Sequence, residues 1–333
     1  MGAENNIMNR YLTDKRRFAD LINVVYYQGK QIVDPDRLTE ISGTTYEVLE
    51  KLEKGKRPKR RERRNDIAMQ YADGRVFRIY LTENQEYVNY VLPIRDMEYL
   101  SAGSKKQIDQ IKKQHEAADD FSTFAEKASG VSKKDRLKPI YLMWLYHGEE
   151  NWDGPRTLKD IMDFGDADAV ESGFSDYSPR LVCINEIKGF ENYQTELREL
   201  FQILGYRKNK KGLQQMLETD ERLQHMDEET IEAVSVLLHA PAIWKNRKKY
   251  MSRNDDKEEY NMCQALREWE EDIRGEFAEK MEKTEAELKK AREEAEKAKE
   301  ESEKAKEESE KAKREASAYL TLLKKYGIDP ESN

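Results

Sequence analysis

The stretch RRNDIAMQYADGRVFRIYLTENQEYVNY, residues 63–90, predicts a β-hairpin in the core of the fold. Two strand-like runs flank Asp73-Gly74, and Asp-Gly between alternating hydrophobic residues is the strongest short hairpin signal. A two-residue turn at this point places Asp66 opposite Leu81 in the neighbouring strand. Because side chains alternate along a strand, the residues expected on the face of Asp66 are Ala68, Phe77, Ile79, Leu81, Glu83 and Gln85.

The acidic end of this face can form a metal site. In the predicted register, Asp66 and Glu83 are diagonal neighbours about 7–8 Å apart at the backbone. Two carboxylates can hold Mg²⁺ together with waters and a substrate phosphate, and Gln85 can orient a water by hydrogen bonding. The alternative is an ordinary hairpin with charged ends. In a chain with 67 Asp and Glu residues, spacing alone favours the ordinary hairpin.

The chain has 333 residues, which is enough for one large domain or two ordinary ones. Its composition is more polar than that of a compact enzyme. Charged residues make up 38% and the mean hydropathy is -1.00, so part of the chain must be solvated. Cys183 and Cys263 are far apart and have no histidine nearby, which predicts buried thiols in a reducing compartment. No long apolar run or N-terminal signal segment occurs. We therefore expect a soluble protein of the bacterial cytosol (cytoplasmic) with no membrane partner.

A net charge of -8 argues mildly against a nucleic-acid partner, but the charge is unevenly distributed. The segment KGKRPKRRERR, residues 54–64, contains eight basic residues and one acidic residue. Such a segment can attract a polyanion locally, and a solvated basic loop is the equally weighted alternative. Its candidate DNA-binding residues are Arg57, Arg60, Arg61, Arg63 and Arg64.

Hydrophobic spacing predicts the order of the elements. Residues 9–27 have the spacing of one helix that ends near Gly29, and residues 87–102 predict a helix that kinks or begins at Pro93. The apolar run Ile140–Tyr146 fits a buried strand. Further expected segments are a short strand at residues 44–49, a polar helical stretch up to Ala128, a strand within residues 179–187 and a helical region at residues 193–273. This order predicts an α/β core with a helical extension.

The C-terminal part repeats every seven residues, as EEAEKAK EESEKAK EESEKAK from Glu293. A seam with alternating steps of four and three residues indicates a coiled coil. The middle of the seam is Ala and Ser, which bury little area at roughly 25 cal/mol per Å². Pairs such as Glu293 and Lys297 stabilise a lone helix by about 0.2–0.5 kcal/mol each. The pattern favours a weak homo-oligomer, and a lone solvated helix is the close alternative. The seam comprises Phe277, Met281, Thr284, Leu288, Ala291, Ala295, Ala298, Ser302, Ala305, Ser309, Ala312, Ala316, Tyr319 and Leu323.

Three blocks follow one another along the chain: RRNDIAMQ, then LTENQEYVNYVLPIRDMEY, then YLMWLYHGEENWDGPRTLKDIMDF. Together with TDKRRFADL in the first helix and a charged, repetitive C-terminus, they resemble the Rpn family of recombination-promoting nucleases and transposases. The spacing from Asp66 to Glu83-Asn84-Gln85 is similar to the D…(D/E)xK signature of the PD-(D/E)XK nuclease superfamily. The resemblance covers roughly residues 8–275.

The resemblance implies an αβββαβ core with a mixed sheet flanked by helices, and DNA cleavage that depends on Mg²⁺, or on Mn²⁺ as the alternative. It implies that Asp66 and Glu83 are catalytic metal ligands. Gln85 takes the catalytic position where the superfamily commonly has Lys, and a neutral amide can position water but cannot act as a base at neutral pH. Asp14 matches an acidic position near the family's site and is a candidate additional metal ligand.

Residues downstream of the hairpin have two interpretations each. Arg95, on the next helix, can reach a DNA phosphate or form a salt bridge that supports the site. His147 and Glu149 follow the apolar run of the third block, where a structural turn is favoured over a ligand role. Trp152 is expected to anchor the core.

The expected organisation is a nuclease-like core at residues 1–190, a helical extension at 191–275, a heptad helix at 276–325 and a flexible tail at 326–333. The leading hypothesis is a metal-dependent DNA endonuclease that hydrolyses phosphodiester bonds in recombination or mobile-element movement. A catalytically inactive DNA-binding or scaffold protein of the same family is the alternative, and a degraded mobile-element relic is the third hypothesis.

Overall fold

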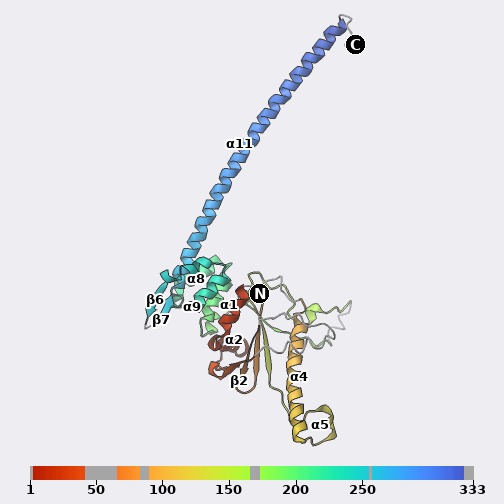
Figure 1. Ribbon diagram of the computed structural model, residues 1–333, viewed down its shortest axis with the longest axis vertical. Helices are drawn as coiled ribbons and strands as arrows, with labels where there is room; N and C mark the ends of the chain where they lie inside the picture. The colour runs from red at the N-terminus through yellow and green to blue at the C-terminus, as the bar shows by residue number, and fades with distance from the viewer. Residues whose placement is uncertain (1–2, 42–65, 83–89, 166–172, 255–256, 326–333) are drawn as a thin grey trace. The chain divides into compact units, whose positions relative to one another are not determined.

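The computed structural model describes residues 3–41, 66–82, 90–165, 173–254 and 257–325 (Figure 1). The chain divides into two compact units, Met1–Leu266 and Arg267–Asn333. The first unit is an α/β fold with a five-stranded mixed sheet, and the second contains most of a long C-terminal helix. The expected α/β class and the long charged helix are therefore confirmed. The expected strand at residues 44–49 lies outside the described residues.

The sheet has the strand order β1-β2-β3-β4-β5. The strands are β1 (Leu38–Glu40), β2 (Asp66–Tyr71), β3 (Val76–Thr82), β4 (Ile140–Tyr146) and β5 (Arg180–Cys183). The first three strands are antiparallel neighbours, whereas β4 is parallel to β3 and β5 is parallel to β4. The crossover from β3 to β4 contains α4 (Leu92–Ala118) and α5 (Phe124–Ser129), because parallel neighbours need a long connection. The expected order of three strands, a helix and a strand is present.

The hairpin exists as predicted, but its register differs by one residue. The loop has three residues, since Tyr71 N–H donates to the carbonyl of Arg75 at 2.8 Å. The Asp73 carboxylate accepts the Arg75 N–H at 3.0 Å, and Gly74 has a φ of 92°, so a longer loop with a left-handed residue replaces the two-residue turn. The predicted pairing of Asp66 with Leu81 is wrong, because Asp66 pairs with Tyr80.

The expected single helix at residues 9–27 is two helices, α1 (Ala3–Thr13) and α2 (Lys15–Tyr27). Asp14 separates them with non-helical backbone angles and caps α2 through its side chain. An Asp at such a position offers the backbone N–H groups an alternative to a continuous helix. The expected end of the segment is confirmed, because α2 stops at Tyr27 and Gly29 has a φ of 81°.

Helices cover both faces of the sheet next to β4. On one face of β4, Trp144 belongs to a buried cluster that includes Tyr99 of α4. On the other face, Tyr141 stacks on Phe77 with ring centroids 4.9 Å apart and meets the ring of Tyr26 in α2 edge-on at 5.0 Å. The whole apolar cluster on the α4 face comprises Leu92, Tyr99, Leu142, Trp144, Tyr146, Trp152 and Cys183. The expected buried strand and the expected core position of Trp152 are both confirmed.

The region after β5 is mostly helical, as predicted, and it also contains a hairpin that the prediction missed. Its helices are α7 (Leu197–Tyr206), α8 (Lys210–Thr219), α9 (Glu228–Leu237) and α10 (Pro241–Lys245), and its hairpin is β6 (Met251–Asn254) with β7 (Lys257–Tyr260). α9 packs against both α1 and α7. This packing makes the helical region part of the first unit, and the predicted domain boundary at residue 190 stays a prediction.

The last helix, α11 (Met262–Lys325), is 64 residues long. Its first turns belong to the first unit, where Met262, Ala265 and Leu266 are buried. Among the described residues, no helix is both long and apolar enough to cross a membrane. Cys183 and Cys263 are both buried, as expected.

Candidate functional site

One edge of the sheet brings together the ends of four strands. Pairing places Asp66, the first residue of β2, opposite Tyr80 near the end of β3. The last residue of β3, Thr82, is opposite Tyr146, and Tyr146 is opposite Cys183 at the end of β5. Ligands in open α/β sheets bind outside the carboxyl ends of the strands. We call this region the carboxyl-end edge, and it is the candidate functional site.

Of the predicted catalytic residues, the structure describes only the backbone of Asp66, at this edge. The structure places the backbone of Asp66 at the start of β2, and Glu83 directly follows Thr82 in the sequence. The side chain of Asp66 and the whole of Glu83 and Gln85 lie outside the described residues. So do the basic residues Arg57, Arg60, Arg61, Arg63 and Arg64. The roles assigned to all of these residues stay predictions.

The observed register changes which positions share a face with position 66. Phe77 and Ile79 pair with Met69 and Ile67, so they alternate with position 66 and do not share its face as predicted. Position 66 forms one row across the sheet with Tyr80, Trp144 and Leu181. The expected backbone separation of Asp66 and Glu83 was based on pairing Asp66 with Leu81, and the observed pairing with Tyr80 removes that basis.

Asp96 is a buried carboxylate in this region that sequence reasoning missed. It lies on α4 with 2% of its surface exposed, and its Oδ1 accepts the Trp144 indole N–H at 2.6 Å. Its Oδ2 accepts the Tyr177 hydroxyl at 2.6 Å. Burial raises the pKa of Asp96, and the two hydrogen bonds oppose that effect. A signal existed in the sequence, because Asp96 falls on the same apolar helical face as Leu92 and Tyr99.

Arg95 is held beside the same aromatic residues. Its Nε donates to the Tyr99 hydroxyl at 2.9 Å. Its guanidinium carbon lies 5.6 Å from the centroid of the Tyr99 ring and 5.9 Å from that of Trp144. These contacts fit a residue that supports the site, and the proposed contact of Arg95 with a DNA phosphate stays a prediction.

His147, which follows β4 directly, is built into the interior. It is 1% exposed, and its Nε2 lies 2.9 Å from Oδ1 of Asn5 in α1. Arg207 donates through Nη2 to the carbonyl oxygens of His147 and Gly148. Burial, with the nearby Arg207 charge, lowers the pKa of His147 to about 3. A neutral, enclosed imidazole with these partners supports the interpretation as a structural turn, whereas Glu149 is exposed.

A pocket of about 470 Å³ lies beside the carboxyl-end edge. Asn185, in its lining, comes two residues after β5 and donates to the carbonyl of Glu150 in the loop after β4, at 3.1 Å. The lining also contains the rings of Phe190 and Tyr206 and the cationic side chain of Lys188. Aromatic rings and cations together are the groups that bind single-stranded nucleic acid.

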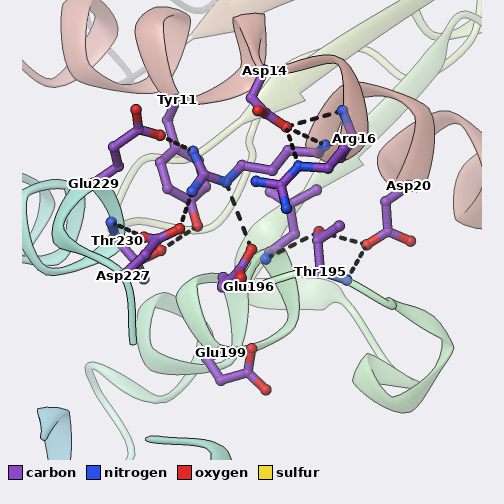
Figure 2. A network of polar contacts seen from close by, with 12 residues as sticks. Tyr11, Asp14, Arg16, Asp20, Thr195, Glu196, Glu199, Asp227, Glu229 and Thr230 are labelled. Carbon is purple, nitrogen blue, oxygen red and sulfur yellow. Dashed lines mark hydrogen bonds and ion pairs between the residues drawn. The ribbon is translucent and has the colours of Figure 1, made fainter. Parts of the chain in front are cut away.

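Asp14 has a structural role at the junction of α1 and α2 (Figure 2). Its Oδ1 accepts the N–H groups of Arg16 and Arg17 at 2.9 and 3.1 Å. These bonds satisfy the first N–H groups of α2, so the acid at this position is explained without a metal. Its predicted role as an additional metal ligand stays a prediction.

Arg17, whose N–H is bonded to Asp14, ties α2 to the helical region through its side chain. It is 1% exposed, and its guanidinium forms ion pairs with Asp227 and Glu229 and lies 3.9 Å from the Tyr11 ring centroid. Figure 2 labels these three partner residues. One turn later, Asp20 accepts the Thr195 N–H at 2.8 Å and the Thr195 hydroxyl at 2.6 Å. This network holds the helices together on the side of α2.

Within the part of the chain that the structure describes, no three His, Cys, Asp or Glu side chains cluster in a way that could hold a metal ion. Comparisons of the chain with protein-family models, with curated proteins and with solved structures each found no match. The candidate site is therefore defined by its position at the carboxyl-end edge of the sheet and by the described residues around that edge.

Proposed function

We propose that this protein is a metal-dependent DNA endonuclease whose site lies at the carboxyl-end edge. The observation that carries the proposal is the convergence of three separate sequence blocks. The block around Asp66 begins β2, the block around Glu83 follows the end of β3, and the block with His147 follows the end of β4. All three strand ends lie at one edge of the sheet, where ligands bind in open α/β sheets.

The chemistry of the donor set suits Mg²⁺, or Mn²⁺ as the alternative. Asp66 and Glu83 would hold the ion, because hard divalent cations prefer carboxylate oxygens. A bound ion of this kind activates water and neutralises charge on a phosphate. Gln85 orients the attacking water through its amide, and it cannot take up the proton itself. Burial keeps His147 neutral and enclosed, so we assign it no catalytic role. The proposed metal ligands are therefore the two carboxylates.

We assign DNA binding to the basic segment 54–64 and to the pocket beside Asn185. The basic residues of segment 54–64 precede β2 directly and can contact phosphates. The pocket beside Asn185 offers Phe190 and Tyr206 for stacking with an unpaired base and Lys188 for its phosphate. A role in recombination or mobile-element movement is part of the same proposal, because such reactions require cleavage of DNA strands.

The proposal is tested by nicking of supercoiled plasmid in Mg²⁺, with the wild type compared with Asp66→Asn and Glu83→Gln. We expect each substitution to slow nicking by about 10²-fold or more, the usual effect of removing one group that stabilises transition-state charge. Glu98→Gln is the matched control, because Glu98 is an exposed carboxylate on α4. Chelation of the metal should stop cleavage by the wild type.

Binding and cleavage are measured separately on the same DNA. Replacing Arg60 and Arg61 with Ala should weaken binding and reduce its salt dependence, because fewer counterions are released. Equal nicking by the wild type and both carboxylate variants would refute the endonuclease proposal. If DNA binding then persists and depends on the basic segment, the alternative of a catalytically inactive DNA-binding protein is supported.

A further inference from the structure

Two rows of charged side chains flank the heptad seam of α11, one on each side. In heptad notation, Met281, Leu288 and Ala295 occupy a positions, and Thr284 and Ala291 occupy d positions. The row at g positions is Lys280, Glu287, Glu294, Glu301 and Glu308. The row at e positions is Glu285, Arg292, Lys299, Lys306 and Lys313. All of these charged side chains are exposed in the single chain.

We propose that α11 pairs in parallel and in register with α11 of a second copy of this chain. In a parallel pair, each g residue meets the e residue five positions later in the other helix. The resulting pairs are Lys280–Glu285, Glu287–Arg292, Glu294–Lys299, Glu301–Lys306 and Glu308–Lys313. Every one of these pairs joins opposite charges, so the g row of one helix is complementary to the e row of the other.

Antiparallel pairing of the same helices is disfavoured by the same charges. In that orientation g residues face g residues and e residues face e residues. The g row is Glu from Glu287 onward, and the e row is Arg or Lys from Arg292 onward, so like charges meet along most of the helix. Electrostatic complementarity selects partners and orientation even where it adds little affinity.

The first charge pair also selects the alignment. Lys280 and Glu285 have the opposite polarity to the four pairs that follow. A shift of one heptad brings Lys280 against Arg292 and Glu287 against Glu285, and both contacts repel. A repeat with identical heptads tolerates such a shift, whereas this reversal of sign disfavours it.

Apolar side chains near both ends of the seam supply contact area for a second helix. Phe277 is 66% exposed, Leu288 is 53% exposed and Tyr319 is 72% exposed. Between Leu288 and Tyr319 the seam consists of Ala and Ser, which allow close approach but bury little surface. This distribution predicts an association that depends on concentration, in which both copies of residues 1–266 are attached at the same end of the paired helices. The inference does not rest on the proposed nuclease activity.

Orientation is tested with single cysteines in the full-length chain, cross-linked under mild oxidation. Ala291→Cys occupies a d position and Ser309→Cys an a position, equally far from residue 300 on either side of the middle of the seam, because antiparallel helices would set a d residue against an a residue. Parallel pairing predicts that each variant cross-links with itself. Glu300→Cys, on the outer face of the helix, is the control and should not cross-link. Cross-linking only in a mixture of the two variants would indicate antiparallel helices and overturn the proposal.

The charge rows are tested by light scattering over a range of protein concentrations. The wild type should approach twice the chain mass of 39.2 kDa. Arg292→Glu, Lys299→Glu, Lys306→Glu and Lys313→Glu combined should raise the dissociation constant at least about tenfold, since Glu then faces Glu in each pair. The matched control combines Lys290→Glu, Lys297→Glu, Lys304→Glu and Lys311→Glu, which make the same charge change on the outer face. A monomeric wild type, or equal effects of the two variants, would overturn the proposal.

Discussion

Replacing His147 with Gln should remove one pH dependence from the stability of the protein. The folded chain lowers the pKa of His147 from 6.5 to about 3, mainly by burial and further through Arg207. The unfolded chain therefore takes up a proton near pH 6.5 that the folded chain does not take up until about pH 3. The stability contributed by the neutral imidazole is complete above pH 6.5 and is lost as the pH falls toward 3.

The magnitude follows from the size of the pKa shift. At 1.36 kcal/mol per unit, the whole shift corresponds to about 5 kcal/mol. Only part of it is lost in an accessible range, and between pH 7 and pH 5 the loss is about 2 kcal/mol. Gln can donate an amide hydrogen toward Asn5 as the imidazole Nε2 does, but it does not titrate in this range.

The assay is urea unfolding at pH 7, 6 and 5, followed by the fluorescence of the tryptophans, which include the buried Trp144 and Trp152. The free energy of unfolding of the wild type minus that of His147→Gln should fall by about 2 kcal/mol from pH 7 to pH 5. Carboxylates elsewhere titrate in both proteins, so they cancel in the difference. A difference that is constant over this range would refute the assignment of a buried, neutral His147.

Substitutions at three further positions test the structure, each by urea unfolding. Asp14→Ala should cost about 1 kcal/mol because it removes the cap of α2, whereas Asp14→Asn keeps an acceptor and should cost little; slower nicking by the stable Asn variant would then indicate a metal ligand. Arg17→Met should cost about 2 kcal/mol, below the 3–5 typical of a broken buried pair, because Asp227 and Glu229 are 35% and 64% exposed and can rehydrate. Gly74→Ala should cost about 1 kcal/mol because Gly74 has a φ of 92°. No change in these free energies would contradict the corresponding contact.

The sequence was sufficient for features that depend on local pattern. The run Ile140–Tyr146 became β4 with the predicted limits, because a continuous apolar segment of that length suits a strand covered on both faces. Pro93 lies in the first turn of α4, where its missing N–H costs nothing. The heptads of α11 form one helix, since helical propensity and spacing both act within a few residues.

Features that depend on competition between nearby and distant contacts were predicted less well. The loop after Tyr71 has three residues because Asp73 binds the backbone of Arg75, and this single added residue moved Asp66 from Leu81 to Tyr80. The hairpin β6–β7 has few apolar residues of its own, and Tyr260 pairs with the backbone of Met226 outside it. Met226 lies far from Tyr260 in the chain, so no local pattern indicates this pairing.

Local residue patterns were therefore enough to predict the identity and order of the main elements and the charged heptads of α11. Long-range packing makes β3, β4 and β5 parallel neighbours, and the start of β2 therefore lies at the same edge as the ends of β3 and β4. Long-range packing also brings Asp96 to Trp144 and Arg17 to Asp227. The physical reason is that helix and strand propensities act over a few residues, whereas register, strand neighbours and buried charge pairs depend on contacts between residues far apart in the chain.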